Sequence, residues 1–175
     1  MSKTQSKVGI TIPEPSPVFT GGAYGSFYSL LDQTVVSGSA KAMSYEVQDV
    51  ASGVSIANNL SLSPTRITIQ NTGIYNIQFS SQFYKTGGGS DAHLIIWLRK
   101  NGNDIPSTST KLHFANNSLY DVAAWNFFVE VTNSNDYFEI MWTQDDAIII
   151  AHEPEDLVVP YPEIPSVILT VNQIA

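Results

Sequence analysis

A chain of 175 residues is long enough for one domain that buries roughly 70% of the surface its unfolded form exposes. Charged residues make up only 14% of the chain and hydrophobic residues 43%, a balance that favours a protein that hides much of its surface in an oligomer or a larger assembly. The formal net charge of −8 argues against a nucleic-acid partner, and the lack of cysteine in the sequence excludes disulfides, zinc–thiolate sites and cysteine nucleophiles.

Residues 1–23 differ in composition from the rest of the chain. "SKTQSK" is polar, and "TIPEPSPVFTGG" alternates proline with residues that favour extended backbone. Because proline fixes its own φ and pushes the preceding residue toward extended geometry, we expect either a disordered tail or an extended arm that docks on a partner. This segment lacks the apolar core of a signal peptide, and no stretch of the chain is apolar over the roughly 20 residues that cross a bilayer. We therefore expect synthesis in the cytoplasm and no membrane insertion.

Residues 24–175 are predicted to form one domain of β-strands separated by turns, without a helical stripe. In "GIYNIQFSSQFY", residues 73–84, apolar and polar side chains alternate almost strictly. One face carries Tyr75, Ile77, Phe79 and Phe83, and the other carries only amides and hydroxyls. That polar face can be solvated, or it can pack against its own copy through hydrogen bonds.

The strand predicted at "LIIWL", residues 94–98, is apolar on both faces, so both faces need cover. Asn101-Gly102 follows it and predicts a tight hairpin turn with positive φ. Pro106 predicts that the returning strand is irregular or lies at an edge. Similar alternation predicts further strands at residues 65–70, 112–114, 121–131, 136–142, 147–151 and 164–174. Since several of these are also apolar on both faces, we expect an antiparallel β-sandwich that oligomerises.

Four segments together carry a family resemblance: "ITIQNTGIYNIQFSSQF", "IIWLRKNGNDIPSTST", "VAAWNFFVEVTNSNDYFEIMW" and "IPSVILTVNQI". A Gly-x-Tyr at Gly73 and Tyr75, an Asn-Gly hairpin and a terminal apolar strand occur in the order found in C1q/TNF-like jelly rolls. "AYGSFYSLLDQTV" is similar to the first strand of that domain. The chain thus resembles the C1q/TNF-like superfamily, and more closely a group of bacteriophage virion proteins with that domain.

The resemblance implies a compact homotrimer whose sheets meet around a threefold axis. It also implies a non-enzymatic role on the virion, as a capsid decoration, a head fibre or a short tail fibre. The arm of residues 1–23 would anchor the trimer to other virion proteins. Apolar side chains expected either in the core or at the trimer interface are Tyr75, Ile77, Phe79, Phe83, Trp97, Trp125, Phe127 and Trp142.

Two alternatives keep the same fold but change the function. The first is a receptor-binding tip that recognises a host-surface glycan through loops on a rigid scaffold. Its candidate contact residues are Tyr84, Lys85, Asp91, Asn116, Asn117 and Tyr120. The second, a secreted cytokine-like or C1q-like ligand, is disfavoured because the sequence has no signal peptide and no cysteine.

Neither a catalytic site nor a cofactor is predicted. The three histidines fall in separate segments and accompany no nucleophile motif. An acidic stretch near residues 145–156 could offer oxygen ligands to calcium, but its spacing matches no calcium loop, which favours solvated carboxylates. The carboxylates concerned are Asp145, Asp146, Glu153 and Asp156.

Overall fold

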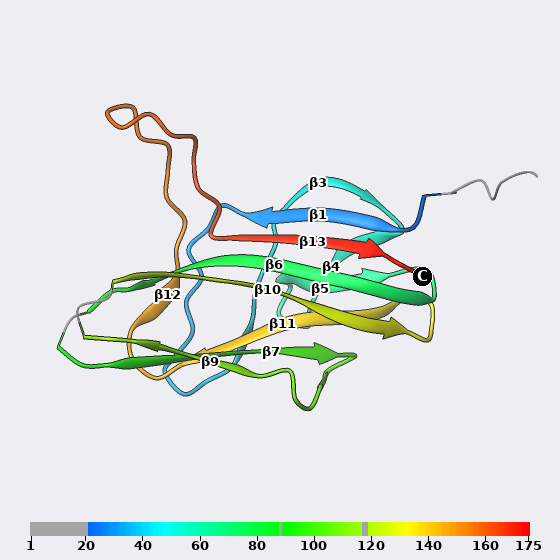
Figure 1. The fold of residues 1–175 in the computed structure, drawn as a ribbon, viewed down its shortest axis with the longest axis horizontal. Coiled ribbons are helices and arrows are strands. Elements are labelled where there is room, and N and C mark those ends of the chain that lie inside the picture. Colours follow the sequence, from blue (N-terminus) through cyan, green and yellow to red (C-terminus); the bar gives the residue numbers. More distant parts are fainter. Residues whose placement is uncertain (1–20, 88, 117–118) are drawn as a thin grey trace, which may run out of the picture.

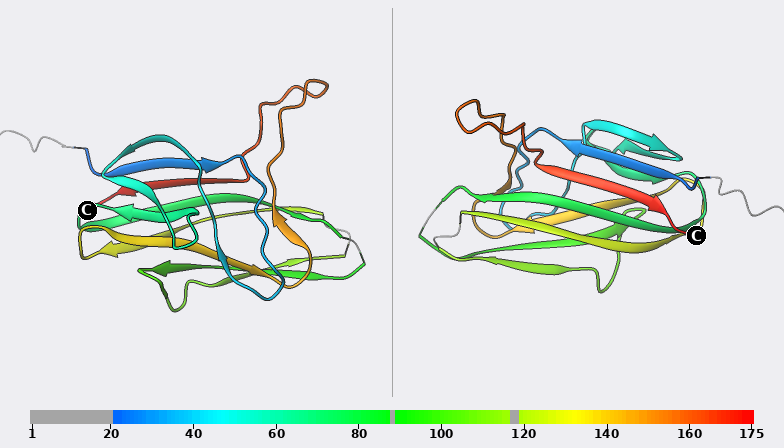
Figure 2. Two further views of the ribbon diagram at one scale, coloured as in Figure 1. Left: turned by 180° about the vertical axis from the view of Figure 1, so that it is seen from behind. Right: turned by 45° about the horizontal axis from the view of Figure 1, so that its top comes forward.

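The computed structural model describes residues 21–87, 89–116 and 119–175. Within these ranges there is no helix, and hence none long and apolar enough to cross a membrane. The chain forms two antiparallel sheets packed face to face (Figures 1 and 2), which confirms the predicted β-sandwich. The proposed arm, residues 1–23, lies almost wholly outside the described part.

The first sheet, sheet A, has the strand order β10-β6-β13-β1-β3, and β12 also pairs with β6. Its strands are β1 (Tyr24–Ser29), β3 (Val47–Ser52), β6 (Gly73–Lys85), β10 (Tyr120–Val131), β12 (Ile148–Ile150) and β13 (Val167–Gln173). The second, sheet B, has the order β4-β5-β11-β7-β8, with β2 on β11 and β9 on β7. Its strands are β2 (Lys41–Ala42), β4 (Val54–Asn58), β5 (Pro64–Ile69), β7 (Ala92–Lys100), β8 (Asn103–Asp104), β9 (Thr110–Phe114) and β11 (Asp136–Gln144).

The core lies between the sheets and is built by strand alternation. On β6 every second side chain from Tyr75 to Phe83 points inward and is buried, because successive strand residues face opposite sides. Phe83 of sheet A meets Trp142 of sheet B with ring centroids 6.3 Å apart. Each large side chain buried in this way contributes about 1.5–3 kcal/mol to folding.

The two apolar faces of "LIIWL", in strand β7, are covered in different ways. Its inward side chains, including Ile96, are fully buried, whereas Ile95 and Trp97 point to the outer face of sheet B and are half-buried. There the Trp97 indole Nε1 donates to Asp104 Oδ1 at 2.7 Å, so the chain that follows the hairpin covers this face locally. The Asn-Gly turn has the predicted positive φ angles, 49° and 82°. The returning strand β8 has two residues and lies at the edge of sheet B, as Pro106 predicted.

The short strands β2, β3 and β4 were not predicted from the sequence. Between β3 and β4 the chain crosses from sheet A to sheet B at Gly53, which has a φ of +70°. A Cβ at this position would lie 2.9 Å from the Cβ of Ala23, so glycine is required for both reasons. Polar residues such as Gln48 and Asp49 hide the alternation here, because β3 is largely exposed.

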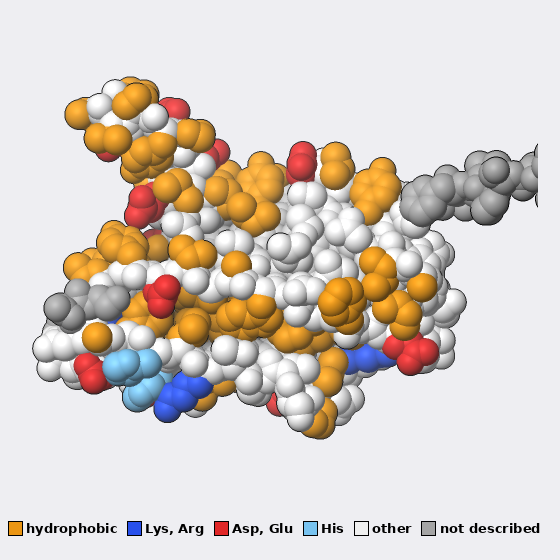
Figure 3. Space-filling view, in the orientation of Figure 1, with side chains coloured by type: hydrophobic (Ala, Val, Ile, Leu, Met, Phe, Trp, Pro, Cys, Tyr) orange, Lys and Arg blue, Asp and Glu red, His pale blue; other side chains and the backbone are white. Residues whose placement is uncertain are grey.

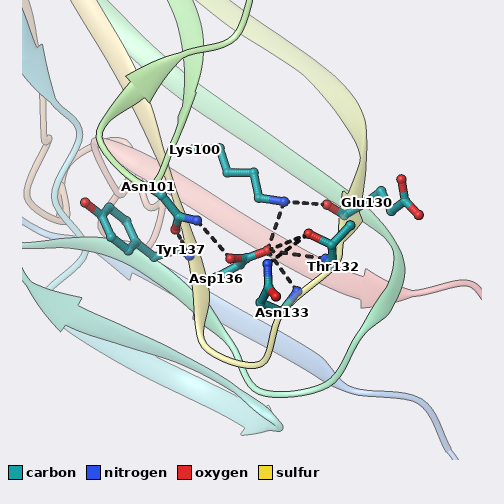
Figure 4. Close-up of polar contacts among 7 residues, drawn as sticks. All are labelled: Lys100, Asn101, Glu130, Thr132, Asn133, Asp136 and Tyr137. Atoms are coloured by element: carbon teal, nitrogen blue, oxygen red, sulfur yellow. Dashed lines mark hydrogen bonds and ion pairs between the residues drawn. The ribbon is translucent and has the colours of Figure 1, made fainter.

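Asp136, at the start of β11, ties two turns together (Figure 4). Its Oδ2 lies 2.9 Å from Lys100 Nζ, at the end of β7, and its Oδ1 accepts from Asn101 Nδ2, in the turn that follows, at 2.8 Å. It also accepts from the backbone N–H groups of Thr132 and Asn133 at 3.3 and 3.2 Å. Hydrogen bonds from Lys100 and then Asn101 hold the pKa of this carboxyl well below its usual range.

Asp136→Asn is expected to lower the free energy of unfolding by roughly 1–3 kcal/mol near neutral pH, because its partners lose a charged acceptor. A depressed folded-state pKa stabilises the protein above the unfolded pKa, at about pH 4, and that contribution is lost as pH falls further. Denaturant unfolding of both proteins should therefore show a gap at about pH 7 that narrows at about pH 2.5. Asp49→Asn, on exposed β3, is the control; a gap independent of pH would contradict the role given to Asp136.

Candidate assembly interface

The strand register determines which side chains lie next to one another on the outer face of sheet A. Asn76 of β6 lies opposite Phe128 of β10 on one side and Asn172 of β13 on the other. In the next rows, Gln78 and Ser80 occupy the equivalent central positions. The polar phase of β6, whose environment the sequence left open, is thus the middle of a broad surface. We call the outward-pointing side chains of β1, β6, β10 and β13 the A face.

The A face has almost no charge. Among its positions, all of which the structure describes, Glu130 alone carries a charged side chain. Amides and hydroxyls fill most of the remainder, and two of the amides pair, with Asn126 Nδ2 donating to Asn76 Oδ1 at 2.9 Å. Figure 3 shows the middle of this face in white and orange, with basic and histidine side chains along its lower margin.

Large apolar side chains are exposed on the A face. Phe128 is 67% exposed and its β10 neighbours Val122 and Tyr120 are 57% and 59% exposed. Ile168 adds a fourth from β13. The sequence "WNFFVEV" explains this, because β10 is apolar on both phases: Trp125 and Phe127 pack against the core while Phe128 points outward. These exposed apolar side chains lie on one face of the sheet among uncharged polar groups, and large exposed apolar groups are common at interaction sites.

The outer face of sheet B has the opposite character. Arg99 Nε lies 2.8 Å from Asp104 Oδ1, and the Arg66 guanidinium lies 4.5 Å from the centroid of the Tyr137 ring. Ion pairs and a cation over an aromatic ring are typical of a solvated surface. The two outer faces therefore differ in kind, and the A face is the one suited to burial.

The structure separates the residues predicted for the core or the interface. Tyr75, Ile77, Phe79, Phe83 and Trp142 are buried between the sheets, and Trp125 and Phe127 are partly buried against them. Trp97 lies apart from these, on the outer face of sheet B. Phe79 packs edge-to-face against Trp125, with ring centroids 4.8 Å apart. Substituting Tyr75 or Phe79 therefore tests the fold and not the interface.

The prediction that Lys85 is an exposed loop contact is wrong. The alternation of β6 continues through it, so Lys85 points inward and is fully buried, and its Nζ donates to the carbonyl of Ser90. Tyr84 and Tyr120 are strand residues facing each other on β6 and β10, with ring centroids 4.7 Å apart. Asn117 lies outside the described residues.

Other predicted loop residues hold the two neighbouring loops together. Asp91 Oδ1 accepts from the backbone N–H of Asn116 at 3.0 Å, and Asn116 Oδ1 accepts from the N–H of Gly89 at 2.5 Å. Asp91 Oδ2 also lies 3.2 Å from His113 Nε2. These contacts place the loops after β6 and β9 side by side at one end of the sandwich (Figure 1).

Of the four acidic residues near 145–156, three make separate side-chain contacts, and Glu153 bonds through its backbone to Ile164. Asp145 Oδ2 lies 2.8 Å from His93 Nδ1, and Asp146 accepts from the Ser90 hydroxyl. Asp156 accepts from the backbone N–H of Val158 at 2.7 Å. Within residues 21–87, 89–116 and 119–175, no group of three or more His, Asp or Glu side chains is arranged to hold a metal ion.

No family model matches the chain, and no curated protein matches its sequence. Among solved structures, 185 chains match. Two are crystal structures of murine APRIL at pH 8.5 and pH 8.0, with TM-scores of 0.53 and 0.52 and sequence identities of 9% and 8%. Each match covers 87% of this chain and 98% of the other. Because identity is so low, the likeness shows the fold alone, which is a TNF-like jelly roll as the sequence resemblance implied.

Phenylalanines on the two sides of sheet A should respond differently to truncation. Phe79→Ala is expected to lower the free energy of unfolding by about 3–5 kcal/mol, because it opens a cavity beside Trp125. Phe128→Ala should change the stability of a single protomer by only about 0.5 kcal/mol, because its side chain is exposed. It should instead weaken self-association.

Denaturant unfolding and light scattering of both variants measure the two effects. Equal losses of stability for the two variants, with no change in mass for Phe128→Ala, would contradict the assignment of the A face.

Proposed function

We propose that this protein is a non-enzymatic structural domain that forms a homotrimer through its A face. The observation that carries the proposal is the contrast between the two outer faces of the sandwich. Sheet B presents ion pairs to solvent, whereas the A face combines exposed Phe128, Val122 and Ile168 with uncharged polar groups. The trimeric state is the one that the C1q/TNF-like resemblance implies, and the TNF-like fold supports it.

The neutrality of the A face fits symmetric self-association. In a homo-oligomer each residue near the symmetry axis approaches its own copies, so like charges would meet and repel. The chain carries a net charge of −8, so a face for self-association must be kept free of most of it. Side-chain amides suit this environment because each offers both donors and acceptors, so Asn76, Gln78 and their copies can pair without charge.

We further propose that the trimer is displayed on a bacteriophage particle, as a capsid decoration, head fibre or short tail fibre. This role is supported by the sequence resemblance of the four quoted segments and by the layout of the domain. β1 begins at the end of the sandwich where the C-terminus lies, and Ala23 N–H donates to Gln173 Oε1 at 3.0 Å. The loops after β6 and β9 lie at the opposite end (Figure 1). An anchor in residues 1–23 would therefore leave those loops pointing outward.

Light scattering of the full-length chain at low micromolar concentration is expected to give three times its mass of 19.1 kDa. Removal of residues 1–23 should leave that ratio at three, because the interface lies in the folded domain. Phe128→Asp combined with Ile168→Asp should give a folded monomer, since charges are then forced together at the axis.

Leu60→Asp, on the turn between β4 and β5, is the matched control and should remain a trimer. A monomeric wild-type chain, or a double variant that stays trimeric, would refute the interface.

A receptor-binding role is the second candidate, and the tyrosine pair of β6 and β10 favours it. Tyr84 and Tyr120 form a tilted pair at the loop end of the domain, and Tyr120 is largely exposed. Exposed aromatic rings offer apolar faces on which sugar rings stack. The neighbouring glycine-rich loop, of which residues 85–87 and 89–91 are described, is suited to shape its contacts to a ligand.

Tyr120→Ala separates the two candidates. If the trimer recognises a glycan here, this substitution should abolish binding on a glycan array while the mass in solution stays unchanged. A wild-type protein that binds no glycan, with a Tyr120→Ala variant that dissociates, would instead assign Tyr120 to the subunit interface.

A further inference from the structure

Strands β12 and β13 are two parts of one strand that runs along β6. Ile150 pairs with Phe83 and Val167 pairs with Ser81, so both strands share one register on β6. Gln82, between these positions, bonds to both: its carbonyl accepts from Ala151 N–H and its N–H donates to the Ser166 carbonyl, each at 2.9 Å. Residues 152–165 are therefore an insertion at a single point of the strand, which we call the excursion.

The excursion has its own internal structure. Glu153 and Ile164 exchange backbone hydrogen bonds of 3.1 and 2.8 Å across its stem. Nearer the tip, Asp156 bridges to Tyr161, and its carboxylate caps the turn by accepting from Val158 N–H. At the base, His152 N–H donates to Asp32 Oδ1 at 2.8 Å. The excursion is thus a braced hairpin, and it stands clear of the sandwich in every view (Figures 1 and 2).

The excursion rises on the A-face side of the sheet. Gln82 belongs to the outward phase of β6, and its side-chain Nε2 donates to the Pro165 carbonyl at 3.0 Å. Tyr120, also on the A face, lies near the stem. Partial desolvation, followed by the negative charge of Glu153, raises the pKa of its hydroxyl. The base of the excursion therefore adjoins the surface proposed to meet other copies.

The tip of the excursion is apolar and uncovered. Leu157, Val158 and Val159 are 86%, 90% and 62% exposed, and no other part of the described chain packs over them. Figure 3 shows orange side chains at this tip, with acidic side chains beside it and along the stem. Three adjacent apolar side chains at the end of a braced projection are costly to leave in water and suited to insertion into a partner.

We propose that the tip of the excursion, Leu157–Val159, packs against a neighbouring copy of this chain in the assembled trimer. This inference rests on the proposed trimer. Because the excursion projects from the edge of the A face, contact between A faces brings a neighbouring copy alongside it. Continuity with that face selects a second copy as the occupant. An anionic lipid surface is disfavoured, because Glu153, Glu155 and Glu163 flank the tip.

The lack of cysteine in the sequence allows a direct test of tip burial. Val158→Cys and Leu60→Cys each introduce one thiol at a position that is 90% or 94% exposed in the single chain. Leu60 lies on the turn between β4 and β5, away from the A face, and serves as the control. In the trimer, the thiol at position 158 should react with a soluble thiol reagent at least about tenfold more slowly than the thiol at position 60.

Mass and reactivity together distinguish the outcomes. A trimer in which both thiols react at the same rate overturns the docking of the tip and leaves the proposed trimer standing. A monomer with equal rates overturns both. If protection at position 158 appears only after anionic vesicles are added, the occupant is a lipid surface and the second-copy assignment is wrong.

A combined L157S, V158S and V159S variant measures the contribution of the tip while keeping the backbone of the hairpin. The expected result is a trimer that dissociates at a protein concentration at least about tenfold higher than wild type, because apolar burial is lost. L60S is the matched control and should dissociate as the wild type does. Equal dissociation of the tip variant and the wild type would overturn the proposal.

Discussion

Strand β6 is the constraint on which the rest of this structure depends. It is paired along its length, with β10 on one side and with β13 and then β12 on the other. Because side chains alternate with a period of two, a one-residue slip of this strand would move Phe79 to the surface and Gln78 into the core. The pairing register therefore fixes both the buried core and the composition of the A face. Gly73 starts the strand where a Cβ would lie 2.4 Å from the Ala175 carbonyl oxygen, so that end is fixed too.

The placement of charge follows from the same division. The ion pairs of the sandwich lie on sheet B and in the turns, where Arg99 contacts Asp104 and Lys100 contacts Asp136. The Asp136 network is buried enough to need its several hydrogen bonds, and it fixes the turns after β7 and β10 relative to each other. Charged side chains thus stabilise turns, and they are nearly absent from the A face, which is the face proposed to contact other copies of the chain.

Strict local alternation made much of the fold predictable from the sequence. The strands from β5 to β13 were recognisable because apolar side chains alternate or run together between turn residues, and the Asn101-Gly102 hairpin follows from backbone sterics alone. Strands β2 to β4 escaped prediction because β2 has only two residues, β3 is mostly exposed and β4 ends in two exposed residues, so the core imposes little alternation on them. Lys85 was misplaced because lysine suggests a surface, whereas the register of β6 carries it inward to the Ser90 carbonyl.

Only part of the A face could be predicted from the sequence. The polar phase of β6 was visible, but the outward position of Phe128 depends on which phase of "WNFFVEV" meets the core, and that is settled by pairing with β6. The excursion was invisible for a similar reason. Residues 147–151 and 164–174 each indicate a strand, but their common register on β6 depends on bonds to Gln82, which is far away in sequence.

The single insertion point has a consequence for how the domain can vary. Gln82 keeps both of its backbone hydrogen bonds, to Ala151 and to Ser166, so the excursion leaves the pairing of β6 intact on either side. An insertion held in this way resembles a large bulge, and lengthening such a loop costs little, because closure entropy grows only with the logarithm of loop length. The core and the strand pairing of β6 are thus insulated from changes at the tip of the excursion. Its tip can be reshaped for a different contact without disturbing the strand that organises the fold.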